Sequence, residues 1–454
     1  MPNPNRKIAK ALNPARQLAL RTLLSMQARN EKVQAALNTT LAAAPATVSQ
    51  KDKALCTQLV YGCIRLKIRL DWILDKFLNK PESVPIPLRR VLRMAVFELF
   101  YLSHIPSYAT LSSYVAAIKS GYGQGLAGLA NAVLRKVSEI PAHDRDWFEA
   151  EIKDPQQFAE VWYSQPGWII NHFFAHYPKN EAETYLEASL ETPPLGIRAN
   201  PLKPGFSATG EELAETGSLL EHSENAYAYA PGKAPEKMGE LLAKGKITRQ
   251  SYAAQIAMQR IFSELKETIA AALRLGPVWD VCAGQGGKTC WMLERGMPVG
   301  LASDTNTSRL EHLQQEITRL GLPAPVIMAA DASMPICIGE QTEAASPGII
   351  FVDAPCSGLG TLARRPDIKI YRKPEELKRL AELQLKIAHA QLESLRPGGL
   401  LVYLTCTLNP DENQKVIGKL LEKNNGAKLI FNYQSLPENP SYEFFWAGVV
   451  QKQA

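Results

Sequence analysis

The sequence predicts a multidomain fold in which an all-α bundle is followed by an α/β domain. Two observations predict it: apolar residues recur at helical spacing through the first 190 residues, and short apolar runs alternate with helical segments after residue 278. The 454 residues, 46% of them hydrophobic, suit about three folded units. We therefore divide the chain into a helical bundle, a helical connector, a small α+β subdomain and an α/β domain, at residues 1–142, 143–192, 193–246 and 247–454.

The front part carries the apolar spacing of amphipathic helices. One stripe follows the i, i+3, i+4, i+7 pattern and comprises Leu88, Val91, Leu92, Ala95, Val96, Leu99 and Leu102. Proline and glycine predict interruptions at residues 81–87 and 121–128. Residues 141–190 continue the helical pattern and are rich in aromatic side chains, as expected of a connector that packs on its neighbours.

Short apolar runs mark the strands of the α/β domain. They lie at residues 278–282, 299–302, 326–329, 348–352 and 400–404, and helical segments at 308–320 and 374–395 separate them. Strands that alternate with helices predict a parallel, doubly wound sheet. Ahead of them, residues 195–200 are expected to be extended, and a short helix is expected around residues 211–220.

Charge is distributed unevenly along the chain. Residues 1–140 carry 20 Lys and Arg against 7 Asp and Glu, a balance of +13, whereas the remaining 314 residues carry 31 against 38, a balance of −7. This asymmetry favours a polyanionic partner for the front part, although a merely solvated basic surface has the same composition. The chain has no apolar run of the ~18 residues that span a bilayer and no signal-peptide pattern, so we expect a cytoplasmic protein without a membrane partner.

The cysteine content argues against a disulfide framework and against a metal site. Seven cysteines are present, an odd number, in a long chain without a secretion signal, and none forms a C-x-x-C pair. His172 and His176 stand four residues apart, but the H-E-x-x-H glutamate is missing, so two surface histidines are expected rather than metal ligands.

A glycine-rich run follows the first strand of the α/β domain and opens a helix. It reads Asp280-Val-Cys-Ala-Gly-Gln-Gly-Gly-Lys-Thr289, and its glycines allow a ligand to approach the backbone at a helix N-terminus. A phosphate-binding P-loop is excluded, because that motif needs glycine where Cys282 stands.

Acidic residues follow three successive strands at the edge where open α/β sheets bind ligands. They are Asp304, Asp331 and Asp353, and Asp304 stands 20 residues after Gly284, the spacing of a carboxylate that binds ribose hydroxyls. Some of these acids could instead be helix N-caps. The fourth strand ends in Asp353-Ala-Pro-Cys356-Ser-Gly358 and the fifth in Thr405-Cys406-Thr407, with Asn409-Pro-Asp-Glu-Asn413 beyond it.

These motifs, in this order, resemble the RNA cytosine-C5 methyltransferases, from about Leu195 to the end of the chain. The helical front, with Asn13-Pro-Ala-Arg16 and Asn131-Ala-Val-Leu-Arg135, resembles the NusB-type RNA-binding domain. The combination resembles the RsmB (Sun/Fmu) type of ribosomal RNA methyltransferase. It implies a NusB-like domain, a Rossmann-like methyltransferase domain, the cofactor S-adenosylmethionine and small-subunit (16S) ribosomal RNA as partner; we further expect a monomer without metal.

The resemblance assigns roles to the motif residues. It implies that Cys406 is the nucleophile that adds to cytosine C6, that Cys356 helps to release the product, and that Asp353 and Lys288 assist at the base. The cofactor-binding set comprises Cys282, Ala283, Gly284, Gln285, Gly286, Gly287, Lys288, Asp304, Arg309, Asp331 and Asp353. Two departures are Gln285, where the family usually has proline, and Asp304-Thr-Asn306, which lacks a second acidic residue.

Several alternatives stay open at this point. Spacing alone allows the two cysteines to exchange roles. The run Arg364–Lys373, with basic and aromatic residues interleaved, suits either RNA contact or a solvated loop. A transfer RNA methyltransferase would share these features. The intact Cys356 and Cys406 argue against a non-catalytic RNA-binding assembly factor, and a protein glutamine methyltransferase would show N-P-P-Y after the fourth strand.

Overall fold

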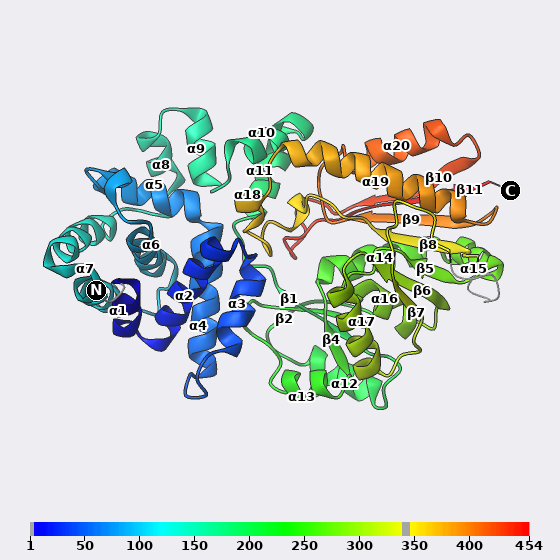
Figure 1. Ribbon diagram of the computed structural model, residues 1–454, viewed down its shortest axis with the longest axis horizontal. Helices are drawn as coiled ribbons and strands as arrows, with labels where there is room; N and C mark the ends of the chain where they lie inside the picture. The colour runs from blue at the N-terminus through cyan, green and yellow to red at the C-terminus, as the bar shows by residue number, and fades with distance from the viewer. Residues whose placement is uncertain (1–3, 338–345, 454) are drawn as a thin grey trace. The chain divides into compact units, whose positions relative to one another are not determined.

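The computed structural model of the protein describes residues 4–337 and 346–453, which form two compact units (Figure 1). The helical unit comprises Met1–Leu190 together with Arg365–Tyr371, and the mixed unit comprises Glu191–Arg364 and Arg372–Ala454. The short segment Arg365–Tyr371 thus leaves the mixed unit in mid-sequence and packs within the helical unit. The residues assigned to a bundle and a connector share one unit.

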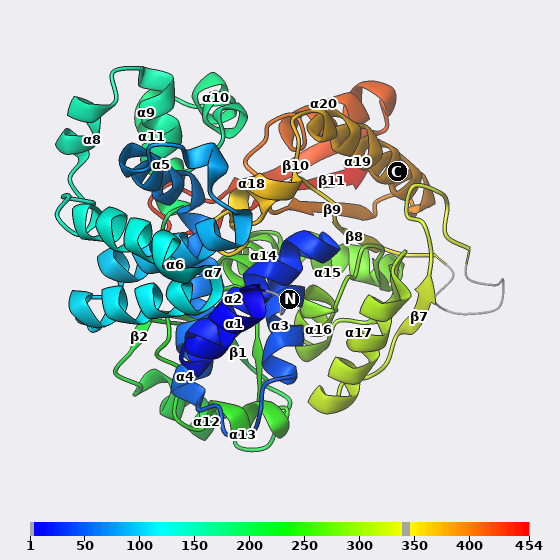
Figure 2. The same cartoon turned by 60° about the vertical axis from the view of Figure 1, so that its left-hand side comes forward.

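Over its described residues, from Pro4 onward, the helical unit has helices and no strand (Figure 2). They are α1 (Pro4–Ala11), α2 (Pro14–Arg29), α3 (Val33–Ala42), α4 (Gln50–Arg65), α5 (Lys67–Phe77), α6 (Ile86–Tyr101), α7 (Ser107–Val137), α8 (Arg145–Glu151), α9 (Pro155–Trp162), α10 (Gly167–His176), α11 (Lys179–Ala188) and α18 (Ile368–Tyr371), with a 3-10 turn η1 at Pro81–Ser83. The expected interruption at residues 121–128 is a kink in α7 at Gly123, whose φ of 83° is accessible to glycine.

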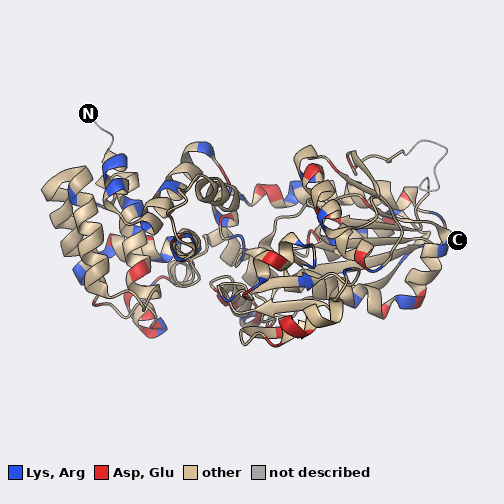
Figure 3. Ribbon diagram, turned by 90° about the horizontal axis from the view of Figure 1, so that it is seen from below, with Lys and Arg blue, Asp and Glu red and all other residues tan. Residues whose placement is uncertain are grey.

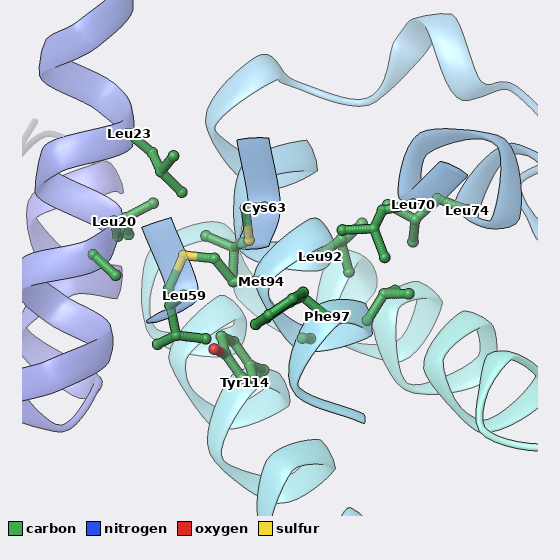
Figure 4. Close-up of a cluster of buried hydrophobic side chains, with 14 of the residues drawn as sticks. Leu20, Leu23, Leu59, Cys63, Leu70, Leu74, Leu92, Met94, Phe97 and Tyr114 are labelled. Atoms are coloured by element: carbon green, nitrogen blue, oxygen red, sulfur yellow. The ribbon is translucent and has the colours of Figure 1, made fainter. Parts of the chain in front are cut away.

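One apolar core fills this unit, and Figure 4 shows its central side chains. Leu59, Met94, Phe97 and Tyr114 meet there from α4, α6 and α7. Phe148 and Val161 from α8 and α9 belong to the same cluster, so residues beyond 142 complete the core rather than form a separate body. Burial of this apolar surface is the main stabilising contribution to the unit.

Several basic residues of the front region form ion pairs with acidic residues within the helical unit. The buried Arg16 pairs with Glu98, and Arg89 and Arg93 pair with acids of α5. Figure 3 shows further basic residues in blue along the first helices. Those with exposed side chains include Arg6, Lys7, Lys10, Arg21 and Arg29. These exposed side chains are the ones available to a polyanion.

The mixed unit begins with a small antiparallel sheet. Its elements are β1 (Leu195–Ala199), α12 (Phe206–Ala214), β2 (Leu219–Ser223), β3 (Ala226–Tyr229), α13 (Met238–Ala243) and β4 (Ile247–Arg249), in strand order β2-β3-β1-β4. Two predictions are corrected here. The helix expected around residues 211–220 ends at Ala214, because Leu219 already pairs with β3; the boundary after residue 246 is wrong, because β4 pairs with β1.

The large sheet has seven strands in the order β10-β11-β9-β8-β5-β6-β7. The strands are β5 (Val278–Asp280), β6 (Val299–Asp304), β7 (Val326–Ala329), β8 (Ile349–Asp353), β9 (Leu400–Thr405), β10 (Ala427–Gln434) and β11 (Trp446–Lys452). The five predicted strands are confirmed and pair in parallel, but β11 runs antiparallel to both β9 and β10, so the sheet is mixed rather than parallel throughout.

Helices cover both faces of the large sheet, which confirms the doubly wound arrangement. They are α14 (Tyr252–Glu264), α15 (Lys266–Leu275), α16 (Gly287–Glu294), α17 (Thr307–Leu320), α19 (Glu375–Ser394) and α20 (Gln414–Lys423). Phe351 and Val402 face α14–α17, whereas their neighbours Val352 and Tyr403 face α19 and α20. Successive strand residues point to opposite faces, so both layers use the same strands. In the described part of the chain, no helix is long and apolar enough to cross a membrane.

Candidate active site

The glycine-rich loop connects β5 to α16 in a tight turn. Gly284 (φ 55°) and Gly286 (φ 87°) adopt the left-handed conformation that favours glycine, and Gly286 caps the N-terminus of α16. A Cβ added to Gly286 would lie 2.2 Å from Leu313 Cδ1, whereas one added to Gly284 would meet no atom within 4 Å. The loop is therefore packed against α17 on one side and open beside Gly284.

Asp304, at the end of β6, braces this loop. Its Oδ2 accepts a hydrogen bond from Gly284 N (3.0 Å) and its Oδ1 accepts one from Asn306 N (2.8 Å). Arg309 Nη1 lies 3.7 Å from the same carboxylate. The N-cap of α17 is Asn306, which accepts from Arg309 N, so Asp304 is not the helix cap that its position also allowed.

The other acids of the predicted cofactor set lie at the same edge of the sheet. Asp331 is exposed after β7 and accepts from Ser333 N (2.9 Å) in a local turn. Cys282 is half-buried, and burial raises the pKa of its thiol well above the ordinary value, so it remains neutral.

Asp280, which no sequence argument assigned a role, is fully buried beneath the loop. Thr289 Oγ1 donates to its Oδ2 at 2.6 Å. Burial raises the pKa of this carboxyl to about 7. The only signal in the sequence was its place at the end of the first strand, which many structural aspartates share.

Lys288 and Asp353 form an ion pair across the strand ends. Lys288 Nζ lies 2.6 Å from Asp353 Oδ2, and the two side chains are 14% and 33% exposed. Burial opposes the charge on Lys288, but the carboxylate of Asp353 outweighs it, with a smaller contribution from the Cys406 sulfur, so the pKa of Lys288 lies above its ordinary value. The ammonium group therefore remains charged beside Asp353.

Cys356 and Cys406 come together at the ends of adjacent parallel strands. Cys356 follows β8 and Cys406 follows β9, and their sulfur atoms lie 3.2 Å apart. Hydrogen bonding to Cys406, together with burial, raises the pKa of Cys356 well above its ordinary value. The protonation of the two thiols is therefore linked, and Lys288 lies near enough to Cys406 for their charges to interact.

Most long side chains of the run Arg364–Lys373 form internal contacts, whereas Arg365 and Lys373 are exposed. Within the helical unit, the buried Lys369 donates from Nζ to Ser164 O (2.5 Å) and Arg65 O (2.6 Å), and Tyr371 OH donates to Glu31 O (2.6 Å). Burial lowers the pKa of Lys369 well below its ordinary value. These two side chains are therefore not available as a basic and aromatic surface.

The two ends of the run Arg364–Lys373 belong to the mixed unit and form contacts there. Arg364 pairs with Glu443 at 2.6 Å, and Arg372 donates from Nη2 to Cys356 O at 3.3 Å. The sequence offered Arg372 only as part of the possible RNA contact and did not predict its contact with the cysteine loop. Among the described residues, no group of three or more His, Cys, Asp or Glu side chains could hold a metal ion.

Two family models and a solved structure match this chain. The family model described as 16S rRNA methyltransferase RsmB/F matches residues 274–441, and the NusB family model matches residues 13–139. Among solved structures, the crystal structure of PH0851 aligns with a TM-score of 0.72 at 20% identity, covering 97% of this chain and 99% of that one. The fold and the matched regions thus define a methyltransferase domain of the RsmB/F class preceded by a NusB domain.

The curated relatives narrow the class to one family. A probable ribosomal RNA small subunit methyltransferase B of Synechocystis is 31% identical over 424 residues, which cover 90% of this chain and 89% of the relative. The ribosomal RNA small subunit methyltransferase B of Shewanella oneidensis is 32% identical over 84% of each chain. This chain belongs to the ribosomal RNA small subunit methyltransferase B family.

Proposed function

We propose that this protein transfers a methyl group from S-adenosylmethionine to C5 of a cytosine in 16S ribosomal RNA, through a covalent bond between Cys406 and C6. The observation that carries the proposal is the pair of thiols 3.2 Å apart, at the same sheet edge as the Lys288–Asp353 ion pair and the glycine loop. The names of the relatives and the NusB match support ribosomal RNA as the substrate.

The residues of the loop fit the cofactor. The backbone beside Gly284 faces open space, and Asp304 and Asp331 present carboxylates at the ends of the next two strands. Carboxylates in these positions accept hydrogen bonds from ribose hydroxyls, and the N-terminus of α16 offers backbone N–H groups. When bound, S-adenosylmethionine supplies an electrophilic methyl group.

Cys406 is the better nucleophile of the two cysteines. Only a thiolate adds readily to C6 of a pyrimidine. The neighbouring Lys288 ammonium favours negative charge on the Cys406 sulfur, whereas hydrogen bonding and burial raise the pKa of Cys356. This distribution of charge agrees with the roles that the family resemblance implies.

The remaining groups complete a balanced reaction. Addition of Cys406 makes C5 enamine-like, with Asp353, held by Lys288, hydrogen-bonding the ring of the cytosine. C5 then takes the methyl group. Once Cys406 is bonded to C6, its sulfur no longer raises the pKa of Cys356, so Cys356 gives up its proton to solvent and the thiolate takes the proton from C5. The S–C6 bond breaks, its electron pair returns to Cys406, and the aromatic ring is restored.

The target cytosine must leave its stack for this chemistry. C5 and C6 are approached from opposite faces by the methyl donor and the thiol, and neither face is accessible in a stacked helix. We therefore expect a single-stranded or flipped nucleotide as the substrate.

Bisulfite sequencing of ribosomal RNA tests the proposal directly. In a strain that lacks the gene, one cytosine of 16S ribosomal RNA should lose its resistance to bisulfite. The wild-type gene should restore that resistance, and the Cys406→Ala gene should not. An unchanged 16S pattern would contradict the proposed substrate, and a change in transfer RNA instead would identify the transfer RNA alternative.

A further inference from the structure

A buried carboxylate lies behind the two cysteine loops. Glu412 belongs to the segment between β9 and α20 and is 0% exposed. The sequence showed it only as part of the run Asn409–Asn413 and assigned it no role. A carboxylate buried to this degree is unfavourable unless hydrogen bonds satisfy it, so its partners show what it does.

Glu412 joins the loop of one cysteine to the loop of the other. Its Oε2 accepts from the backbone N–H of Ser357 at 2.8 Å, and Ser357 directly follows Cys356. Its Oε1 accepts from Asn409 Nδ2 at 3.0 Å, and Asn409 belongs to the loop that carries Cys406. One side chain therefore holds both loops through its two oxygens.

Further hydrogen bonds hold the neighbours of the cysteines to the same network. Gln384, on α19, donates from Nε2 both to Glu412 Oε2 (2.9 Å) and to Pro355 O (2.9 Å). The hydroxyls of Ser357 and Thr407 lie 2.7 Å apart. The residues on both sides of Cys356, and the residue after Cys406, are thus fixed relative to Glu412.

We propose that Glu412 is a positioning residue that sets the separation between the Cys356 and Cys406 sulfur atoms. The consequence for methyl transfer rests on the proposed function above, but the effect on the separation does not. A carboxylate accepts hydrogen bonds on both of its oxygens, whereas a side-chain amide accepts them on one oxygen only. In Glu412→Gln one of the two oxygens is replaced by an NH₂ group, which is a hydrogen-bond donor. In one orientation this donor meets the Asn409 donor, and in the other it meets the donors of Ser357 and Gln384. This change keeps the volume and removes half of the bridge.

The test measures how readily the two cysteines form a disulfide, which depends on the separation of their sulfur atoms. In a glutathione buffer, both thiols lose their protons and two electrons to one oxidised glutathione, which yields the Cys356–Cys406 disulfide and two reduced glutathiones. The equilibrium constant is the effective concentration of one thiol at the other, and peptide mass spectrometry separates this pair from the other five cysteines. We expect Glu412→Gln to lower it at least tenfold.

The matched control is Glu422→Gln, the same change at an exposed position on α20. It should leave the effective concentration unchanged. An unchanged value in Glu412→Gln, with S-adenosylmethionine affinity as in the wild type, would overturn the proposal. If Glu412→Gln does not fold, Gln384→Met removes one donor to each of Glu412 and Pro355. It should lower the value by a smaller factor, and no change there would equally contradict the proposal.

Methylation kinetics provide the second measurement. Displacement of Cys356 should lower kcat at least tenfold in Glu412→Gln and leave the KM values for RNA and S-adenosylmethionine within twofold, because Glu412 lies behind the loops. A rise in KM with unchanged kcat would contradict a positioning role. If the wild-type protein methylates no RNA, the proposed function fails, while the disulfide equilibrium still decides the role of Glu412.

Discussion

The sulfur atoms of Cys356 and Cys406 lie 3.2 Å apart, within hydrogen-bonding distance for thiols, at the ends of two adjacent parallel strands. Because they share this contact, the protonation of one depends on the other: the hydrogen bond to Cys406 contributes to the raised pKa of Cys356. The two residues therefore act as a pair, and substitutions at both positions are needed to separate their roles.

Replacement of Cys356 should trap the reaction halfway. In Cys356→Ser, Cys406 still adds to C6 and methyl transfer still proceeds, but the group that takes the C5 proton is absent. Protein should accumulate covalently joined to methylated RNA and migrate as a heavier band on a denaturing gel.

The double variant Cys356→Ser with Cys406→Ala is the control, and it should give no band because no thiol can add to C6. The opposite pattern, a band with Cys406→Ser and none with Cys356→Ser, would assign the nucleophile to Cys356.

Removal of Cys406, the proposed nucleophile, should leave the proposed cofactor site intact. Cys406 follows β9, whereas the glycine loop follows β5, two strands away in the sheet. We expect Cys406→Ala to abolish methylation and to change S-adenosylmethionine affinity by less than twofold in calorimetry. A variant that retained near wild-type turnover would exclude Cys406 as the nucleophile.

Replacement of Asp304, unlike that of Cys406, should weaken the binding of S-adenosylmethionine. In Asp304→Ala, Gly284 N and Asn306 N lose their acceptor, and the cofactor loses its ribose partner. Cofactor binding should weaken by about 1.5–3 kcal/mol, the usual range for hydrogen bonds to a charged group. Asp304→Asn keeps one acceptor for the loop and should lose less. Equal affinities for the wild type and the alanine variant, measured by calorimetry, would move the ribose contact elsewhere.

The buried Asp280 should make stability depend on pH. Its pKa is about 7 in the folded protein against 3.8 for the free group, so the folded state holds the proton more tightly. The proton's contribution is fully present below pH 3.8 and is lost as pH rises to about 7, a change of about 4 kcal/mol for 3 pKa units. Asp280→Asn keeps an acceptor for Thr289 and cannot ionise.

Amide hydrogen exchange in β5 and α16 checks this expectation at pH 5 and pH 8. The protection of Asp280→Asn relative to the wild type should increase from the lower to the higher pH. The exposed Asp146→Asn provides the control and should show a constant difference. A constant difference for Asp280→Asn as well would show that this carboxyl does not titrate in the range.

Local sequence patterns were sufficient for the strands and for placing the candidate site residues at one edge of the sheet. The strand predicted at residues 326–329 matches β7, and the other four differ by at most two residues at either end. Each is a short apolar run with an acid or the cysteine motif at or near its end. The same pattern therefore predicts both the strand and the polar residue at the end of that strand. Asp353 and Cys356 could be placed together on that ground.

The contacts that sequence missed join positions far apart in the chain. Glu412 reaches Ser357 across 55 residues, and Lys369 reaches Arg65 across 304. A charged side chain is usually solvated, and nothing in the neighbouring sequence of either residue shows that tertiary packing buries it. The direction of β11 was missed for the same reason, because it depends on pairing with β9 and not on its own composition.

The last prediction concerns the exposed basic residues of the first helices. Deletion of residues 1–140 would test their role poorly, because Phe148 and Val161 share the core of that unit and would lose their packing. Replacement of Arg6, Lys7 and Lys10 by Gln removes three exposed charges from α1 and leaves the core intact. RNA binding should weaken, and the slope of log K against log salt should fall by about 0.7–0.9 for each RNA phosphate that the variant no longer neutralises.

Three exposed lysines of the mixed unit, Lys419, Lys423 and Lys428, provide the matched control for charge. Their replacement by Gln removes the same net charge, so a general field effect would lower affinity equally in both triple variants. A specific contact of the first helix with RNA would instead change the salt slope only in the variant of α1. Equal slopes in the wild type and both variants, measured by filter binding between about 50 and 200 mM salt, would mean that these basic residues of α1 are only a solvated surface.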